Sequence, residues 1–467
     1  MTIEAFTPII TTDHPKSDPI YRQIAQQINQ LILNGTLTGG GKLPTHRALA
    51  DHLAVTVGTV TRAYAEAERQ GLVEARIGAG TFVSQANKPN WVYNYSEASP
   101  ADGCNFGYNI PPQLDRAVML TQAMQSLSSD PQQLNQLMLY QDPQGLTAHR
   151  QIIAQWLQQK DIAINAERMH FTSGGQHAAQ LALSAFCHSG DTVLVESVSY
   201  PGFLSLAKQQ QVTVKSVEMD AEGLMPASLE KACQLYQPRL VYCTPTMQNP
   251  TTVTMGEQRR RDILAVCQQH QVLIIEDDVN GLMPTRRPSP LVNLNSEQVI
   301  HIGGLSKCLA PGLRLGYIQV PTRHQKRLNT ALHNHSLMIS PLLSALACKL
   351  IQQGDADRIL QQIRHDIAAR QRLVTHYLAE FTIAHDNASF HVWLTLPEHW
   401  RLSDFVSAAE DAKVTVKSAE LFTPPGCTTP PAVRLAISAP VNHQQLEQGL
   451  QILSDLLRTD PVSDFPL

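Results

Sequence analysis

The hydrophobic pattern at the start of the chain is helical, and it recurs in three successive segments. In the first segment the apolar residues fall at helical spacing: Ile24, Ile28, Leu31 and Ile32. Gly35 predicts the end of this helix, and Thr45 can cap a second one. A third helix is predicted to begin at Thr56 or Thr59 and to end at Gly71. Because LVEARIGAGTFV then supplies two short β-rich pieces around a glycine turn, we expect three helices followed by a hairpin.

From Asn105 onward the pattern changes, because short apolar runs alternate with longer amphipathic stretches. The runs are VTVKSVEM, RLVYCTP, VLIIEDD and VIHIGGL. This alternation predicts an α/β domain with a mainly parallel sheet covered by helices, in which ligands arrive at the carboxyl ends of the strands. Between the two patterns, SQANKPNWVYNYSEASPADG shows neither periodicity and is predicted to be a linker. We therefore expect a helical domain at 1–83, a linker at 84–103 and a large domain at 104–467.

Composition narrows the functional classes. A chain of 467 residues is too long for one ordinary core, which agrees with two domains. The net charge of -4 argues against general polyanion binding, so any contact with DNA must come from a local patch. No apolar run reaches membrane-spanning length, and MTIEAFTPII does not resemble a signal peptide. The eight cysteines lie far apart without a Cys-x-x-Cys pair, so we expect no metal site and a cytoplasmic location.

The N-terminal segment carries the motifs of a DNA-binding family. Three helices followed by a glycine-tipped hairpin is the layout of a winged helix-turn-helix. LILNGTLTGGGKLPTHRALADHLAV matches the helix, turn and Leu-Pro-x-x-Arg pattern of GntR-type DNA-binding domains, and the match continues through TVTRAYAEAERQGLV to GTFV. The segment therefore resembles a GntR-type domain, which implies double-stranded operator DNA as a partner.

In that binding mode the third helix enters the major groove, and the wing approaches the minor groove or the backbone. The resemblance implies six contact residues: Arg47, Thr56, Thr59, Arg62, Gly80 and Thr81. For a single arginine, a solvated helix face remains the plain alternative. The excess of basic residues in this segment is slight, so nonspecific affinity should be modest and a dimer would help. Val57 stands where many family members carry an arginine, which leaves the bases that are read open.

A lysine and an arginine suited to one cofactor lie close together in HIGGLSKCLAPGLRLGY, from His301 to Tyr317. Small residues before Lys307 suggest a partly desolvated amine, and desolvation favours the nucleophilic free base. Arg314 is a permanent cation suited to a phosphate. This pair is what a Schiff base of pyridoxal 5'-phosphate (PLP) requires, although a surface lysine near a structural arginine is the alternative. SKCLAPGLRLGY resembles the PLP-lysine motif of fold-type I aminotransferases, in the form found in MocR-type regulators of the GntR family.

The resemblance covers the large domain and implies further cofactor ligands. HFTSGGQHAAQLAL runs from a strand into a helix, where Gly174, Gly175 and Gln176 would bind the phosphate through backbone N–H groups and the helix N-terminus. Tyr200 is implied to stack on the pyridine ring. Asn249, in an Asn-Pro-Thr signature, is implied to hydrogen-bond the phenolic oxygen.

Three more residues follow from the same resemblance. Asp277 would face the pyridine nitrogen and keep it protonated, so that the ring acts as an electron sink. Arg434 would grip the α-carboxylate of a substrate with its two-pronged guanidinium. Tyr140, in YQDPQGLTAHR, would reach the cofactor phosphate of a partner subunit, because the family forms head-to-tail homodimers. A core or interface aromatic is the alternative for Tyr140.

Two positions depart from the family pattern. Asn280 replaces a tyrosine that assists the phenolic oxygen, so it would contact the cofactor only through its amide. Gly304 removes a phosphate-binding hydroxyl. Since the lysine, aspartate, asparagine and arginine remain, cofactor binding should survive while fast catalysis is less assured. The hypothesis is that this site holds its ligand as an aldimine and converts it poorly.

The sequence therefore predicts a cytoplasmic, homodimeric transcription regulator with PLP on Lys307. An amine or amino acid, or PLP itself, would be the signal. One alternative is an active aminotransferase with an accessory DNA-binding domain, which multiple turnover would reveal. A second is a DNA-binding protein with a cofactor-free scaffold, against which Lys307, Asp277 and Arg314 argue. The effector, the operator and the direction of regulation stay open.

Overall fold

The computed structural model describes residues 3–6, 19–33, 36–38, 40–69, 72–76, 80–83 and 103–460. The chain divides into two compact units, Met1–Tyr95 and Ser96–Leu467, here called the N-terminal unit and the large unit. The predicted helix ends at Gly35 and Gly71 lie outside the described residues, as does nearly all of the predicted linker at 84–103.

The N-terminal unit contains the predicted helices and hairpin. Its elements are η1 (Ile3–Ala5), α1 (Ile20–Leu33), α2 (His46–Leu53), α3 (Val57–Arg69), β1 (Val73–Arg76) and β2 (Gly80–Val83). Ile24 and Ile28 are buried in its core, as the helical spacing requires. The Thr45 hydroxyl accepts from the amide of Ala48 at the start of α2, so this predicted cap is present. β1 and β2 pair antiparallel.

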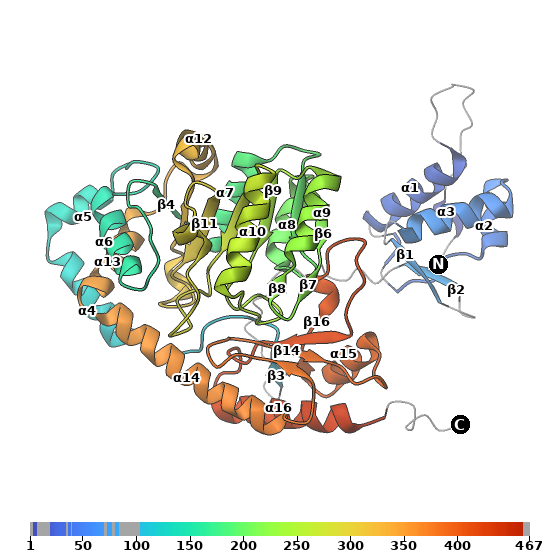
Figure 1. Ribbon diagram of the computed structural model, residues 1–467. Helices are drawn as coiled ribbons and strands as arrows, with labels where there is room; N and C mark the ends of the chain where they lie inside the picture. Colours follow the sequence, from blue (N-terminus) through green and yellow to red (C-terminus); the bar gives the residue numbers. More distant parts are fainter. Residues whose placement is uncertain are drawn as a thin grey trace. The chain divides into compact units, whose positions relative to one another are not determined.

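The large unit is built on a seven-stranded sheet in the order β4-β12-β11-β10-β9-β5-β6 (Figure 1). Its strands are β4 (Met169–Thr172), β5 (Thr192–Glu196), β6 (Thr213–Val217), β9 (Leu240–Cys243), β10 (Leu273–Asp277), β11 (Val299–Gly304) and β12 (Gly316–Gln319). All neighbouring pairs are parallel except those of β12, which runs antiparallel to β11 and β4. The four predicted apolar runs form β6, β9, β10 and β11.

Helices cover both faces of this sheet. One core holds side chains of α7 (Gly175–Phe186), α8 (Pro201–Gln209) and α12 (Gln325–Ser336). The core on the other face holds side chains of α6 (Thr147–Gln158), α9 (Pro226–Tyr236), α10 (Glu257–Gln269), α11 (Leu291–Leu294) and α13 (Pro341–Gln352). The strands are buried on both sides, which explains why they are continuous apolar runs. α4 (Ala117–Ser128), α5 (Pro131–Leu137), η2 (Pro311–Leu313) and η3 (Thr322–His324) complete this layer.

A smaller layer follows at the C-terminal end, beyond the long helix α14 (Asp355–Tyr377) (Figure 1). Its antiparallel sheet has the order β13-β14-β17-β16. The strands are β13 (Ile383–Ala384), β14 (Val392–Thr395), β16 (Lys417–Ser418) and β17 (Ala432–Leu435). Apolar residues of α14, α15 (Leu402–Asp411) and α16 (His443–Arg458) form its core. The remaining elements are β3 (Cys104–Asn105), which pairs with β15 (Val414–Thr415), the ribbon of β7 (Met219–Asp220) and β8 (Gly223–Leu224), and η4 (Ala419–Phe422).

Among the described residues, no helix combines the length and apolar character that crossing a membrane requires.

Candidate cofactor pocket and DNA-binding surface

The predicted cofactor residues gather where the parallel strands of the large sheet end. Lys307 follows β11, and its Nζ atom donates a hydrogen bond to the backbone carbonyl of Asn109. The same Nζ lies 5.2 Å from the centre of the Phe390 ring. Burial, together with the positive charge of Arg434, lowers the pKa of Lys307 to about 7, while Asp277 opposes the shift. A large share of free amine is therefore present at neutral pH, as a nucleophile requires.

Asp277, the last residue of β10, is buried, and two polar groups donate hydrogen bonds to its carboxylate. The Tyr242 hydroxyl donates to its Oδ2 atom at 2.7 Å, and the amide of Val279 donates to its Oδ1 atom at 3.3 Å. The Tyr242 ring stacks on Phe203 with ring centres 3.8 Å apart, which fixes the phenol. Burial raises the pKa of Asp277 above its ordinary value, and the hydrogen bonds from Tyr242 and Val279 act against that rise.

Arg434, on β17 of the smaller sheet, reaches the predicted asparagine of the larger one. Its Nη1 atom donates to Asn249 Oδ1 at 3.2 Å, and its Nη2 atom donates to the carbonyl of Gly107 at 2.7 Å. Both Asn249 and Arg434 are buried. The pocket therefore combines side chains of two layers that are far apart in sequence, and its cation is held in a fixed orientation suited to a carboxylate.

A second cation lies at the start of α7. Arg314 donates from Nη2 to the carbonyl of Ser173 at 2.9 Å. Gly174, with φ of 90°, precedes the helix, and a Cβ atom there would lie 2.8 Å from the Arg314 Nη2 atom. Glycine is therefore required for this close approach. The free amides of the helix N-terminus and the guanidinium together form a site for a phosphate, and Gly175 and Gln176 are its next residues.

The three remaining residues that are predicted to contact the cofactor differ in their surroundings. Tyr200 precedes α8, and its ring lies directly over Gly202, where a Cβ atom would collide with it. Asn280 is buried, and its Nδ2 atom donates to the carbonyl of Met247 at 2.9 Å. One amide hydrogen of Asn280 is therefore already engaged by the backbone. Tyr140 is 82% exposed and lies outside the pocket of its own chain, as a residue that serves a partner subunit would.

The predicted DNA-binding residues lie on exposed parts of the N-terminal unit. Arg47 on α2 and Arg62 on α3 are exposed, as is Gly80 at the start of β2. Thr56 has a structural role, because its hydroxyl accepts from the amide of Thr59 at 3.1 Å and so caps α3, which begins at Val57. Thr59 is half-buried and shares a hydroxyl contact of 2.8 Å with Thr56.

The wing is anchored by a basic residue. Lys42 forms a β-bridge with Phe82, and its Nζ atom lies 5.8 Å from the centre of the Phe82 ring. Thr81, half-buried on β2, accepts at its backbone carbonyl from the amide of Leu43. The hairpin is thus joined to the turn before α2, which places the start of the wing at a fixed distance from the recognition helices.

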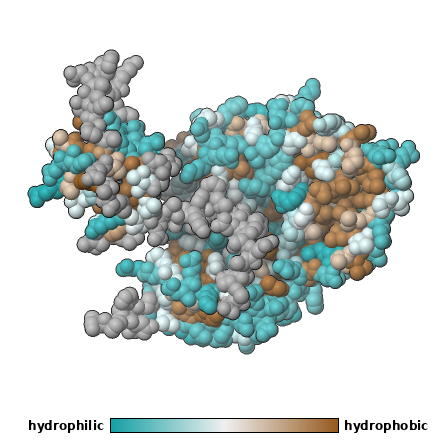
Figure 2. All heavy atoms as spheres, turned by 180° about the vertical axis from the view of Figure 1, so that it is seen from behind, coloured by the Kyte–Doolittle hydropathy of each residue, from teal (hydrophilic) through white to brown (hydrophobic). Residues whose placement is uncertain are grey.

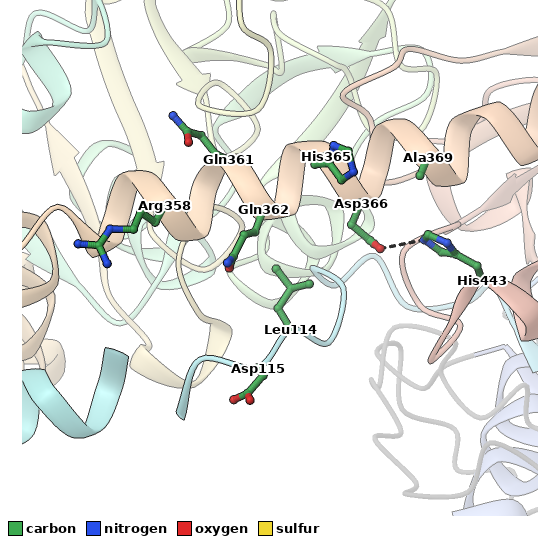
Figure 3. Close-up of a pocket in the computed structure, with 9 residues that line it drawn as sticks. All are labelled: Leu114, Asp115, Arg358, Gln361, Gln362, His365, Asp366, Ala369 and His443. Carbon is green, nitrogen blue, oxygen red and sulfur yellow. Dashed lines mark hydrogen bonds and ion pairs between the residues drawn. The ribbon is translucent and has the colours of Figure 1, made fainter. Parts of the chain in front are cut away.

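A separate groove of about 690 Å³ runs along α14 (Figure 3). Its floor and walls include Leu114, Arg358, His365, Asp366 and His443. Asp366 lies 2.9 Å from His443 Nε2, the contact drawn in the figure, and 2.6 Å from Nε of the buried Arg370. The groove contains none of the residues predicted from the sequence.

Comparison with known proteins identifies a family for each unit. The family of aminotransferases of class I and II matches residues 101–453, and the gntR family of bacterial regulatory proteins matches residues 20–83. An uncharacterized HTH-type transcriptional regulator of Bacillus subtilis, YdeF, is 31% identical over 440 residues, which cover 94% of each chain. The chain belongs to the GntR-type regulators that carry an aminotransferase class I and II domain. The family resemblance and the fold class predicted from the sequence are thereby confirmed.

Other similarities of this regulator are weaker but consistent. The vitamin B6 salvage pathway transcriptional repressor PtsJ of Salmonella typhimurium is 27% identical over 388 residues, or 83% of the regulator and 87% of PtsJ. The crystal structure of a kynurenine aminotransferase of Pyrococcus horikoshii aligns with a TM-score of 0.71 at 22% identity, covering 77% of the regulator and 91% of that chain. The structural likeness shows that the large unit has the aminotransferase fold.

The donor set of the regulator fits PLP. Lys307 supplies an amine, Asp277 a buried carboxylate, and Arg314 with the start of α7 a phosphate site. At Gly304 a Cβ atom would have the amide nitrogen of Gly175 as its nearest atom, at 3.8 Å, so this position adjoins the start of α7. Together with membership of the aminotransferase class I and II family, this agrees with the prediction of PLP as cofactor.

Sequence reasoning missed a second layer of polar residues around the pocket. His391, which immediately precedes β14, lies 3.1 Å from the carbonyl of Gln248 through Nε2, and 3.3 Å from the Asn109 side-chain amide through Nδ1. Burial, with Arg434 second, lowers the pKa of His391 to about 3, so the ring is neutral and can donate at one nitrogen while it accepts at the other. Glu196 is also buried, and burial raises its pKa to about 8. Glu196 begins the segment ESVSYPGF that ends a predicted strand before Tyr200, but nothing in the sequence indicated its burial, and His391 lies in no motif.

Proposed function

We propose that this protein is a transcription regulator that binds operator DNA through its N-terminal unit and detects an amine or amino acid, or PLP itself, at Lys307. The observation that carries the proposal is a desolvated lysine close to Asp277 and Arg434, on the same chain as a GntR-type domain. A DNA-binding enzyme would need the same pocket, so the departures at Asn280 and Gly304 decide between sensing and turnover. Its place of action would be the cytoplasm.

The pocket residues would divide the work as follows. Arg314, with Gly174, Gly175 and Gln176, would bind the phosphate. Lys307 would hold the aldehyde carbon, Asp277 the pyridine nitrogen, and Tyr200 one face of the ring. When bound, PLP supplies an electron-withdrawing ring that acidifies the carbon next to an amine. The buried Tyr242 phenol positions Asp277 for its role.

The arrangement around Arg434 favours a carboxylate-bearing effector. Its guanidinium is buried, and its partners include one side-chain oxygen and one backbone carbonyl, both neutral. A carboxylate is a stronger acceptor than either of them, because the hydrogen bonds become charge-assisted at both ends. An amino acid would therefore satisfy Lys307 with its amine and Arg434 with its carboxylate, whereas a simple amine would leave the arginine as it is.

Ligand binding can influence DNA binding only through contacts that differ between two states of the protein. An amino acid that draws Arg434 away from Asn249 and Gly107 would change contacts between the smaller layer and the larger one. This exchange of partners is the proposed differential contact. It could bias the placement of two DNA-binding units in a dimer.

We further infer a head-to-tail homodimer from the surface of the large unit. Large apolar side chains are exposed on and beside α4, α5 and α13: Val118, Met124, Met138, Leu139, Tyr140 and Leu342. Figure 2 shows an apolar patch on the molecule seen from behind, at the end where Figure 1 places these helices. A patch of this kind is typical of a protein–protein interface. Tyr140 would cross that interface and reach the phosphate of the partner.

The decisive experiment measures DNA occupancy with and without ligand. Genomic fragments bound by the PLP-loaded protein would be sequenced in the absence and presence of candidate amines and amino acids. We expect paired half-sites, with occupancy that changes for at least one amino acid. Lys307→Ala should retain DNA binding but lose the ligand effect, and Lys231→Ala, an exposed lysine on α9, should behave like the parent protein. A ligand effect that persists in Lys307→Ala would contradict the proposal.

Turnover tests the alternative of an active aminotransferase. An aromatic-amino-acid aminotransferase of Thermococcus litoralis is 30% identical over 277 residues, which cover 56% of this chain and 66% of that enzyme. Multiple turnovers at enzyme-like rates, on the order of 10 per second, would make catalysis the main function. A single slow conversion per site would support sensing.

A further inference from the structure

A second hollow lies at the opposite end of the large sheet from the cofactor pocket. It encloses about 390 Å³ at the amino ends of three neighbouring strands. Leu240 and Leu273 are the first residues of β9 and β10, and Gln298 precedes β11. α12, which supplies one wall, lies in Figure 1 on the side of the sheet away from β14 and β16. Because β10 rises about 3.3 Å per residue, its two ends are roughly 13 Å apart, and the hollow is distinct from the cofactor pocket.

The walls of this hollow carry three arginines and one histidine. Arg239 precedes β9, Arg323 and His324 lie in η3, and Arg327 lies in the first turn of α12. Arg239 donates from Nε to the carbonyl of Phe186, at 3.4 Å, and Arg327 lies 5.6 Å from the centre of the Phe186 ring. In the part of the chain that the structure describes, neither Arg239 nor Arg327 has an acidic partner within 4.0 Å. Their charges are therefore available to a ligand.

The neighbouring acids do not neutralise this cluster. Glu297 contacts Arg168 at 2.9 Å and Arg323 at 3.9 Å, so one carboxylate is shared by two arginines. It also accepts from the amide and hydroxyl of Thr322. Asp191 accepts from the amide of His188, and no ion pair among the described residues joins it to these arginines. The cations also affect His324, since burial lowers its pKa and the charges of Arg323 and Arg327 lower it further. The hollow thus has an excess of positive charge.

The groove along α14 provides a contrast within the same unit (Figure 3). There Asp366 is held between His443 and Arg370, and Arg358 lies 3.0 Å from Asp355. These charges are paired by the protein itself. In the arginine-lined hollow Arg239 and Arg327 have no such partner among the described residues, and holding three guanidinium groups together costs repulsion. Arginines that repel one another in this way are expected where a negatively charged ligand offsets the repulsion.

We propose that this hollow binds a small molecule with two or more linked phosphate groups. Guanidinium groups match phosphate oxygens two at a time, and several arginines around one space can surround a multiply charged group. The side chains of Gln268 and Gln271 line the same hollow and offer neutral donors to further oxygens. Its volume is that of a small-molecule site, and its half-enclosed form excludes a duplex, so the phosphates belong to a metabolite such as a nucleotide.

Calorimetry with pyrophosphate and ATP tests the proposal on the full-length, PLP-loaded protein. Fixing PLP with borohydride first keeps the probes out of the cofactor pocket, and the absorbance of the fixed cofactor reports separately whether that pocket was filled. We expect one site per chain. Arg239→Gln combined with Arg327→Gln should weaken binding of both probes by about tenfold or more, because two charge-assisted contacts are lost.

The matched control is Arg372→Gln, which removes an exposed arginine from α14 and should bind the probes like the parent protein. Circular dichroism would verify that all variants are folded. Affinity weaker than about 1 mM in the parent, or equal affinity in parent and double variant, would overturn the proposal. It would also be overturned if the double variant lost affinity for a non-operator DNA duplex and kept its affinity for pyrophosphate.

Discussion

The two predicted binding regions of this regulator are built in opposite ways. On the N-terminal unit the candidate DNA contacts, Arg47 and Arg62, extend from exposed helix surfaces. In the large unit Asn249, Asp277 and Arg434 are buried, and each is held by hydrogen bonds from other side chains or backbone groups. The DNA-binding region therefore meets its ligand at the protein surface. The polar groups of the cofactor site are already removed from water when the protein folds.

This difference predicts how each region responds to substitution. Exposed charges contribute little individually and are screened by salt, so DNA binding should be graded and tolerant. Removing one partner from a buried charged network costs about 3–5 kcal/mol, because the other partner is left without compensation. A single substitution of a central pocket residue should therefore abolish ligand binding there. Each substitution on the DNA-binding surface should weaken DNA binding only in part.

The largest effect is expected from Lys307→Ala. The parent protein should be yellow with PLP, and borohydride should attach the cofactor covalently to Lys307. Without the amine no such bond can form, so the attachment should be lost completely. Peptide mass spectrometry after reduction measures it, with Lys231→Ala as the control that keeps the label. A parent protein that stays colourless in the presence of PLP would refute the cofactor assignment.

The second-largest effect, on the rate of amino-acid conversion, is expected at position 280, where asparagine stands in place of the family's tyrosine. In the parent protein, amino acids should change the PLP spectrum quickly, while keto-acid product accumulates far below the ordinary enzyme rate of about 10 per second. Asn280 donates to the carbonyl of Met247 and has no titrating proton to offer. Asn280→Tyr restores a phenol and should raise the rate of half-transamination, measured by stopped-flow absorbance. Enzyme-like turnover in the unmodified protein is the opposing outcome.

A smaller effect is expected at the DNA surface. Arg47→Ala or Arg62→Ala should weaken operator binding by about 1–3 kcal/mol if that arginine reads a base edge. Binding should also decrease with added salt, because phosphate contacts release counterions. Fluorescence anisotropy at two salt concentrations measures both quantities. If both variants bind the operator as the parent does, the recognition surface lies elsewhere on the unit.

The smallest effect is the pH dependence of PLP capture by Lys307. The pKa of Lys307 is lowered to about 7 by burial, so below pH 7 the ammonium form prevails. The rate of PLP capture should therefore fall about tenfold per pH unit below 7 and level off above it, whereas an ordinary lysine would continue to gain reactivity toward pH 10. Growth of the absorbance band over time measures the rate. A rate that still rises between pH 8 and pH 10 would show a solvated lysine.

The sequence was sufficient for the fold and for the motif residues at strand ends. Apolar runs buried on both faces of a parallel sheet leave a continuous hydrophobic signal, and β9, β10 and β11 were located by it. Since such strands end at one edge, the residues that follow them were expected to meet. Lys307 and Asp277 do lie close enough for their charges to interact.

The missing parts have a common physical cause, which is long-range packing. Tyr242 contacts Asp277 from a neighbouring strand, and His391, just before β14, reaches Gln248. The arginine-lined hollow unites Arg239 with Arg327, which belong to segments with no motif. Periodicity describes how one element faces its core, but it does not specify which elements are neighbours. The antiparallel position of β12 was missed for the same reason.

Two adjacent glycines of β11, Gly303 and Gly304, differ in how much room a side chain would have. At Gly303 a side chain would collide with the Tyr317 ring, so this position is locked by its neighbour. At Gly304 the nearest atoms to an added Cβ are 3.8 Å and 3.9 Å away, which is ordinary contact. A serine side chain therefore fits at Gly304 without disturbing the fold. Steric necessity explains the glycine at 303 but not the glycine at 304.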